Sequence, residues 1–158
     1  YDQFRQGKTA PPYLVLAGGK GWLDSGIYKK VEELGLGDLV KFTEYVPDEE
    51  ICPLMCGALA FVFPSIYEGF GLPPLEAMAC GVPVLTTHAA SLPEVVGEDA
   101  VVADPYSPES IAAGLEQLYT DEALRQKLRE AGPKRAAQFT WERSAEQLYA
   151  VYQEACRE

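Results

Sequence analysis

The feature that most constrains the fold is a strand–loop–helix–strand succession within residues 59–87. Residues 59–63 are all apolar, which is typical of a strand buried on both faces of a parallel sheet. A glycine-bearing loop follows, then a short helix over about 74–80 and a second apolar strand over 84–86. Two strands joined by a helix indicate a parallel pair with a right-handed crossover.

The same alternation extends along the rest of the chain. Strands are predicted at 13–17, 40–43, 59–63, 84–86 and 101–103. Helices are predicted at 25–34, from 48, at 74–80 and, in succession, from 108, 121 and 140, and residues 1–7 resemble the tail of a further helix. The pattern predicts an α/β fold: a Rossmann-like open parallel sheet flanked by helices, with a C-terminal helical extension.

Capping residues mark several of the helix starts. Ser107 is a predicted N-cap, and Asp121 and Thr140 begin the two helices after it. Asp48 is predicted to cap an earlier helix, which Pro53 should keep short.

Length and charge exclude several classes of protein. The 158 residues fit one domain, 1–158, and 47% hydrophobic with 23% charged residues is ordinary for a globular chain. A formal net charge of −11 argues against nucleic acid as a partner and against docking of this domain onto anionic lipid. The longest apolar run is also too short to span a bilayer, so no membrane span is expected.

The four cysteines do not form a recognisable zinc pattern. Cys52 and Cys56 lie one helical turn apart, but Cys80 and Cys156 supply no second close pair, and the only histidine, His88, is distant in sequence. We expect reduced thiols at helix and core positions, as is usual in the cytoplasm, and no metal. Incidental surface thiols and redox sensitivity are the alternatives.

Two carboxylates, Glu68 and Glu76, stand eight residues apart across the loop and the helix that follows it. Pro64-Ser65 precedes them, Gly69-Phe70-Gly71 lies between them, and residues 76–84 read Glu-Ala-Met-Ala-Cys-Gly-Val-Pro-Val. Taken together, these residues resemble the Glu-x7-Glu donor-binding signature of glycosyltransferase family 4, which consists of retaining enzymes of the GT-B fold. The resemblance covers residues 13–152, including a late Phe-Thr-Trp-Glu sequence that is similar to the family's Phe-Ser-Trp.

The resemblance implies different roles for the two carboxylates. It assigns Glu76 to both hydroxyls of the donor ribose, a contact that an ionised carboxylate can make by accepting two hydrogen bonds. It places Glu68 nearer the donor sugar or its phosphate, as the residue closest to catalysis. The alternatives are a solvent-facing carboxylate at the helix dipole for Glu76 and a solvated loop residue for Glu68.

The glycine-bearing loop is a candidate for binding the donor's phosphates. Negative charge develops on the leaving pyrophosphate, and oriented amides at a helix N-terminus can stabilise it. Gly69 and Gly71 would let the backbone approach a ligand and adopt conformations closed to other residues. Prolines follow Leu72, so the amides of Phe70, Gly71 and Leu72 are the expected contacts. The alternative is a tight turn that needs glycine for its geometry alone.

Four further residues carry weaker signals. The resemblance places Tyr45 and Val46, after the second strand, near the donor base, with a plain turn as the alternative. Lys20 would lie near the phosphates, with a surface lysine as the alternative. His88 is interpreted as a packing or rim residue.

The resemblance implies a retaining, metal-independent hexosyltransferase of polysaccharide biosynthesis. Its donor would be a GDP- or UDP-linked hexose such as mannose or glucose, and its acceptor a hydroxyl group. No cofactor is expected, because the chain has no Asp-x-Asp triplet for a metal-bridged pyrophosphate. A non-catalytic nucleotide-sugar or protein-binding module of the same fold is the alternative. A receiver or flavin carrier is disfavoured, because the chain lacks acidic clusters at the strand ends and a phosphate loop after the first strand.

The resemblance also predicts that the chain is a fragment. Related proteins place a first strand with a Gly-Arg pair, a helix beginning near a lysine, and an N-terminal acceptor domain before this point. Without these parts the fragment should be inactive. We expect the whole enzyme to be cytoplasmic, at the inner membrane face if the N-terminal domain binds there.

Overall fold

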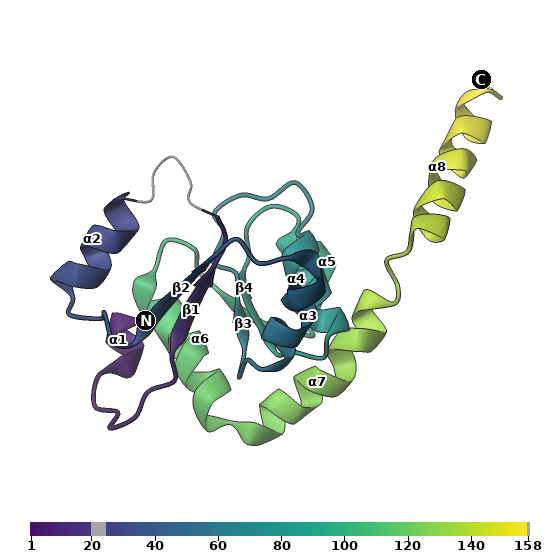
Figure 1. The fold of residues 1–158 in the computed structure, drawn as a ribbon. Coiled ribbons are helices and arrows are strands. Elements are labelled where there is room, and N and C mark those ends of the chain that lie inside the picture. Colours follow the sequence, from purple (N-terminus) through teal and green to yellow (C-terminus); the bar gives the residue numbers. More distant parts are fainter. Residues whose placement is uncertain (20–24, 158) are drawn as a thin grey trace.

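The computed structural model describes residues 1–19 and 25–157 and has the predicted α/β architecture (Figure 1). Its strands are β1 (Leu14–Ala17), β2 (Val40–Glu44), β3 (Phe61–Val62), β4 (Val84–Thr87) and β5 (Val101–Ala103). Its helices are α1 (Asp2–Arg5), α2 (Ser25–Glu33), α3 (Asp48–Cys56), α4 (Leu72–Ala79), α5 (Leu92–Val96), α6 (Pro108–Thr120), α7 (Glu122–Ala136) and α8 (Trp141–Ala155). Every predicted strand is present, and α5 is a helix that the sequence pattern did not predict.

All strand pairs are parallel, and within the described residues they form two sheets rather than one. β1 pairs with β2, and β4 lies between β3 and β5. The connection from β3 through α4 to β4 is the predicted strand–helix–strand unit. β3 is shorter than predicted: its pairing begins where the Phe61 amide donates to the carbonyl of Pro83, which has no amide to extend the ladder backwards.

The core lies around β4, whose four residues are all buried. One cluster joins β4 to α4 and α5 through Met78 and Val95, and a second joins it to α6 and α7 through Leu118 and Leu128. Burial of each large apolar side chain contributes about 1.5–3 kcal/mol. Close approach of α4 and α7 depends on Gly132, where a Cβ would lie 3.0 Å from the carbonyl oxygen of Met78.

Of the two predicted N-caps, Ser107 is confirmed and Asp48 is not, and the helices predicted to start at Asp121 and Thr140 are present with these residues as N-caps. Ser107, Asp121 and Thr140 each accept a hydrogen bond from the backbone amide three residues ahead. The prediction for Asp48 is wrong: Pro47 occupies the N-cap position, and Asp48 is the first residue of α3, where its charge suits the helix dipole.

Helix α8 contains no buried residue, and Figure 1 shows it extending away from the rest of the chain. Leu148, Val151 and Tyr152 form its apolar face but are 52%, 59% and 59% exposed. Of the helices described, none combines the length and the apolar character needed to cross a membrane.

The cysteines are free thiols, and the expectation that they fill core positions is wrong for three of the four. Cys52 and Cys56 lie on α3, and Cys80 and Cys156 are the C-caps of α4 and α8, so the helix part of the expectation is confirmed. Cys52, Cys56 and Cys156 are exposed, whereas Cys80 is partly buried and packs against the cluster that contains Met78.

Candidate functional site

The loop over residues 63–71, between β3 and α4, is the centre of the candidate site, and its first half is fixed by β4. The hydroxyl of Thr86 donates to the carbonyl of Phe63 at 3.1 Å, and that of Thr87 donates to the carbonyl of Ser65 at 2.6 Å. Both threonines are fully buried. Each such bond contributes about 0.5–1.5 kcal/mol, so a loop without regular structure is anchored to a core strand.

The second half of the loop is held by Ser91, the N-cap residue of α5. Its hydroxyl lies 2.7 Å from the carbonyl oxygen of Phe70 and 3.2 Å from that of Glu68. In Figure 1 the loops after β3 and β4 run together along the upper side of the molecule. Hydroxyl groups from β4 and α5 therefore define the path of the backbone on both sides of Glu68.

The two carboxylates have different surroundings. Glu68 is half-buried, and its Oε1 accepts a hydrogen bond of 2.6 Å from the hydroxyl of Ser65. This bond to a charged group orients the carboxylate at the carboxyl end of β3. Glu76 is exposed on α4, between Leu75 and Ala77, which are buried. One carboxylate is therefore positioned by the loop, and the other projects from a helix packed on the core.

Gly71 is required by geometry, and Gly69 is not. Gly71 is the N-cap of α4 with φ of +111°, and a Cβ there would lie 2.8 Å from Cδ2 of Leu92. Gly69 has no such φ, and a Cβ there would meet nothing within 4 Å. The prediction that both glycines adopt conformations closed to other residues is therefore confirmed for Gly71 and wrong for Gly69, which borders open space.

The start of α4 presents unused backbone donors. Among the described residues, the amides of Phe70, Gly71 and Leu72 donate to no protein group, while Pro73 and Pro74 have no amide to donate. Leu72 itself is 52% exposed. Amides at the positive end of a helix attract anions, so this corner suits a negatively charged group.

Residues at the end of α7 and just after it contact both α5 and the loop. The guanidinium of Arg135 donates to the carbonyls of Val95, at 2.9 Å, and Glu94, which are orphan acceptors at the end of α5. Arg135 also lies over the ring of Phe139, and that ring meets Phe70 edge-to-face at 5.9 Å. Ser91, at the start of α5, also bonds to the loop. Helix α5 is therefore connected to α7 at one end and to the loop at the other.

Four residues that support the loop were not predicted from the sequence: Thr86, Thr87, Ser91 and Arg135. Two of the signals were readable. Thr86 and Thr87 are a polar pair at the end of an otherwise apolar strand, and Ser91 precedes a Leu-Pro pair, which is typical of a helix N-terminus. Arg135 acts through contacts 40 residues away in sequence, which no local pattern indicates.

The remaining predicted residues do not join this loop. Tyr45 is 73% exposed and Val46 is half-buried, both after β2 in the other sheet, and no hydrogen bond or ring contact links them to residues 63–71 within the described chain. His88 is exposed, with its amide bonded to Ala103, as a rim residue would be. Lys20 lies outside the described residues.

The loop faces open surface, since Ile66, Tyr67 and Phe70 are 56%, 79% and 44% exposed. Two hollows of about 420 Å³ and 240 Å³ lie along α7 and at the junction of α7 with α8, and neither is lined by residues 63–71. A ligand bound at the loop would therefore meet the Glu68 carboxylate and the free amides on one of its sides, with its other side exposed.

Comparisons with known proteins agree on one family. The family model described as "Glycosyl transferases group 1" matches residues 2–135. O-antigen chain mannosyltransferase B of Escherichia coli is 42% identical over 139 residues, which are 88% of this chain and 36% of the relative. MMP alpha-(1->4)-mannosyltransferase of Mycolicibacterium hassiacum is 38% identical over 131 residues, which are 80% of this chain and 32% of the relative. The chain thus spans about a third of the length of these relatives.

A solved structure extends the similarity to the fold. Sucrose-phosphate synthase from Thermosynechococcus elongatus superposes with a TM-score of 0.80 at 30% sequence identity. The match covers 91% of this chain and 38% of the synthase.

Proposed function

This chain belongs to the group 1 glycosyl transferases, and on that premise we propose that it is the nucleotide-sugar-binding part of a hexosyltransferase. Its fold is that of one half of a GT-B enzyme. Within the group, the Glu68–Glu76 spacing favours a retaining enzyme of family 4. The names of two relatives, both mannosyltransferases, favour a hexose such as mannose as the transferred sugar.

The observation that carries this proposal is the supported loop. A half-buried carboxylate held by Ser65 lies in the same nine-residue segment as the free amides of Phe70 and Gly71. A nucleotide sugar needs both features at adjacent places, because its phosphates are anionic and its sugar carries the reacting carbon. Hydrogen bonds from the hydroxyls of Thr87 and Ser91 hold the loop backbone on both sides of Glu68, and so fix the carboxylate relative to the amides.

We assign roles according to where negative charge develops during transfer. The bond between the anomeric carbon and the phosphate oxygen breaks, and the amides of Phe70, Gly71 and Leu72 stabilise the charge that collects on the diphosphate. Glu76 accepts hydrogen bonds from the ribose hydroxyls, and Tyr45 and Val46 border the base. Glu68 acts on the donor sugar. Transfer then proceeds with retention at the anomeric carbon and without a catalytic metal.

The acceptor-binding site and part of the phosphate site would belong to the whole protein, which is longer than this chain if it resembles its relatives. We place the reaction in polysaccharide biosynthesis, on the pattern of the O-antigen relative, and in the cytoplasm, where GDP- and UDP-linked donors would be bound. A non-catalytic nucleotide-sugar or protein-binding module of the same fold is the competing proposal. Loss of Glu68 would favour such a module, and this chain has Glu68 in an oriented position, which favours an enzyme.

The test is a donor panel on the full-length protein that contains this chain. Calorimetry with GDP-mannose, GDP-glucose, UDP-glucose and UDP-galactose identifies the donor, and an assay for released nucleoside diphosphate, with and without EDTA, measures turnover and any dependence on metal. We expect one donor to bind at least about tenfold more tightly than the others, equivalent to about 1.4 kcal/mol, and EDTA to have no effect on turnover. Equal, weak binding of all four donors contradicts the proposal, and donor binding without hydrolysis or transfer supports the non-catalytic module.

A further inference from the structure

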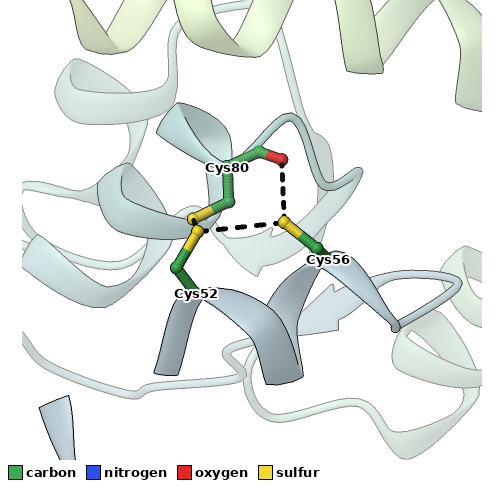
Figure 2. A group of neighbouring side chains, drawn as sticks. All are labelled: Cys52, Cys56 and Cys80. Carbon is green, nitrogen blue, oxygen red and sulfur yellow. Dashed lines mark hydrogen bonds between the residues drawn. The ribbon is translucent and has the colours of Figure 1, made fainter. Parts of the chain in front are cut away.

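Helices α3 and α4 bring together three thiols that lie up to 28 residues apart in sequence (Figure 2). Cys52 and Cys56 project from consecutive turns of α3, with their sulfur atoms 3.8 Å apart. Cys80 ends α4, and its sulfur lies 2.7 Å from that of Cys52. All three sulfurs lie within 4.8 Å of one another.

This geometry matches a thiolate ligand set. Zinc–sulfur bonds of about 2.3 Å at tetrahedral angles place neighbouring sulfurs about 3.8 Å apart. The Cys52–Cys56 pair has this separation, and the Cys52–Cys80 pair reaches it by opening about 1 Å, equivalent to a small side-chain rotation at an exposed position. The helix fixes the first pair, and the neighbouring helix supplies the third ligand.

We propose that Cys52, Cys56 and Cys80 bind one thiophilic divalent cation, Zn²⁺, with water as the fourth ligand. Among the described residues, the group contains no further Cys, His, Asp or Glu, and the thiols on α3 are open to solvent. Binding releases three protons and transfers no electrons: Zn²⁺, three thiols and one water give a complex of charge −1 and three H⁺. The site is independent of the proposed transfer reaction.

A redox disulfide between Cys52 and Cys80 is the competing use of the same thiols. A disulfide joins only two sulfurs, whereas a cation uses all three sulfurs that the two helices gather. A bound cation also deprotonates its thiol ligands by its own charge.

The ion would join α3 to the end of α4 that is remote from the loop. Gly71 caps the start of α4 and Cys80 ends it, and eight helical residues span about 12 Å. The cation therefore contacts none of the candidate donor residues. It would stabilise the folded protein by mass action, because an unfolded chain does not hold the three thiols together.

The experiment compares metal binding by the full-length protein and its variants after reduction with a phosphine and removal of metal. Co²⁺ serves as the spectroscopic probe, and Zn²⁺ is then added in competition. We expect one equivalent of Co²⁺ with thiolate charge-transfer and tetrahedral ligand-field bands, displaced stoichiometrically by Zn²⁺. Cys52→Ser, Cys56→Ser and Cys80→Ser should each weaken binding at least tenfold.

Cys156→Ser is the matched control, because this exposed thiol lies at the end of α8 and should leave binding unchanged. Zn²⁺ should raise Tm of the parent and of this control, but not of the triple Cys52/Cys56/Cys80→Ser variant. Circular dichroism of each metal-free variant checks that it folds. Equal metal uptake by the parent and the triple variant overturns the proposal, and so does a Cys52–Cys80 disulfide in the protein as isolated.

Discussion

At the residue scale, Glu68 and Glu76 differ in how firmly the protein holds them. Glu68 is half-buried and accepts a hydrogen bond from Ser65, whereas Glu76 is exposed on α4 and, among the residues that the structure describes, bonds through its backbone only. A held carboxylate suits a reacting centre, where orientation matters in the transition state. An exposed one suits a ligand group that completes its hydrogen bonds on binding. The two should therefore respond differently to substitution.

We expect Glu68→Gln in the full-length enzyme to lower kcat at least about tenfold, or about 1.4 kcal/mol, by removing the charge while keeping the shape. Affinity for the nucleoside diphosphate should stay within about threefold, because the lost interaction acts mainly in the transition state. Steady-state kinetics and calorimetry measure the two quantities. Glu98→Gln, at an exposed site, is the control. An unchanged kcat would remove Glu68 from the chemistry.

Glu76→Ala should lower nucleotide affinity by about 1.5–3 kcal/mol, the range for hydrogen bonds to a charged group. The calorimetric comparison uses ribonucleotide and 2′,3′-dideoxyribonucleotide diphosphates on the full-length protein. The parent should prefer the ribonucleotide and the variant should not. A variant that keeps the preference would show that another group binds the ribose.

Gly71→Ala should destabilise the fold by about 2–4 kcal/mol, because alanine is strained at φ of +111° and its Cβ crowds Leu92. Gly69→Ala is the matched control: its backbone is unstrained and its surroundings are open, so stability should change by less than about 1 kcal/mol. Denaturant unfolding measures both variants. Equal losses of stability in the two variants would show that the positive φ of Gly71 and its contact with Leu92 are not the cause of the destabilisation.

At the element scale, the predictions from sequence were most accurate where a single segment decides its own structure. The strands at 14–17, 40–44, 84–87 and 101–103, and the three side-chain caps of the last helices, agree with local apolar runs and capping residues. Each of these signals lies within a few residues of the element that it forms.

Predictions failed where distant segments decide the outcome. The thiol cluster needs Cys80 beside α3, and the loop support needs α7 against α5; both are tertiary contacts without local pattern. α4 also begins two residues before the predicted start, since Gly71 can act as its cap. The position of the loop was predicted correctly from the sequence, but the hydrogen bonds that support it were not.

Ser91→Ala should loosen the loop, because the serine hydroxyl is bonded to the carbonyls of Phe70 and Glu68. We expect a loss of about 1 kcal/mol in stability, faster hydrogen exchange of amides 68–72, and a lower kcat through a less ordered Glu68. Ser144→Ala, which also removes one hydroxyl bond but lies on α8, should change stability alone and by no more. Unchanged hydrogen exchange of these amides would show that the bond from Thr87 is enough to hold the loop.

At the scale of the whole molecule, the candidate site is exposed on the surface of this chain. Ile66 and Tyr67 of the loop are exposed, and the chain corresponds to about a third of the length of its relatives. A donor could therefore be held on one side while its reacting carbon remains in water. Exclusion of water and the placing of an acceptor would need further protein.

The purified 158-residue chain should consequently show no sugar transfer, although it contains Glu68 and Glu76. A radiolabelled-donor assay of the chain, beside the full-length protein at equal concentration, makes the comparison. A buffer blank gives the background of the assay, and the full-length Glu68→Gln variant gives the signal of an impaired enzyme. Transfer by the isolated chain above the blank would mean that acceptor binding and catalysis reside within these residues.

The division of the strands into two sheets has a consequence for how the chain behaves in solution. Within the described residues β1, β2, β3 and β5 each pair on one side only, and an unpaired strand edge is a template for another copy. The net charge of −11 opposes such contacts by repulsion between copies. Salt screens this repulsion, with a Debye length that shrinks to about 3 Å at 1 M. We therefore expect the isolated chain to stay monomeric at low ionic strength. Added salt should promote association between strand edges of different copies at concentrations that leave the core folded.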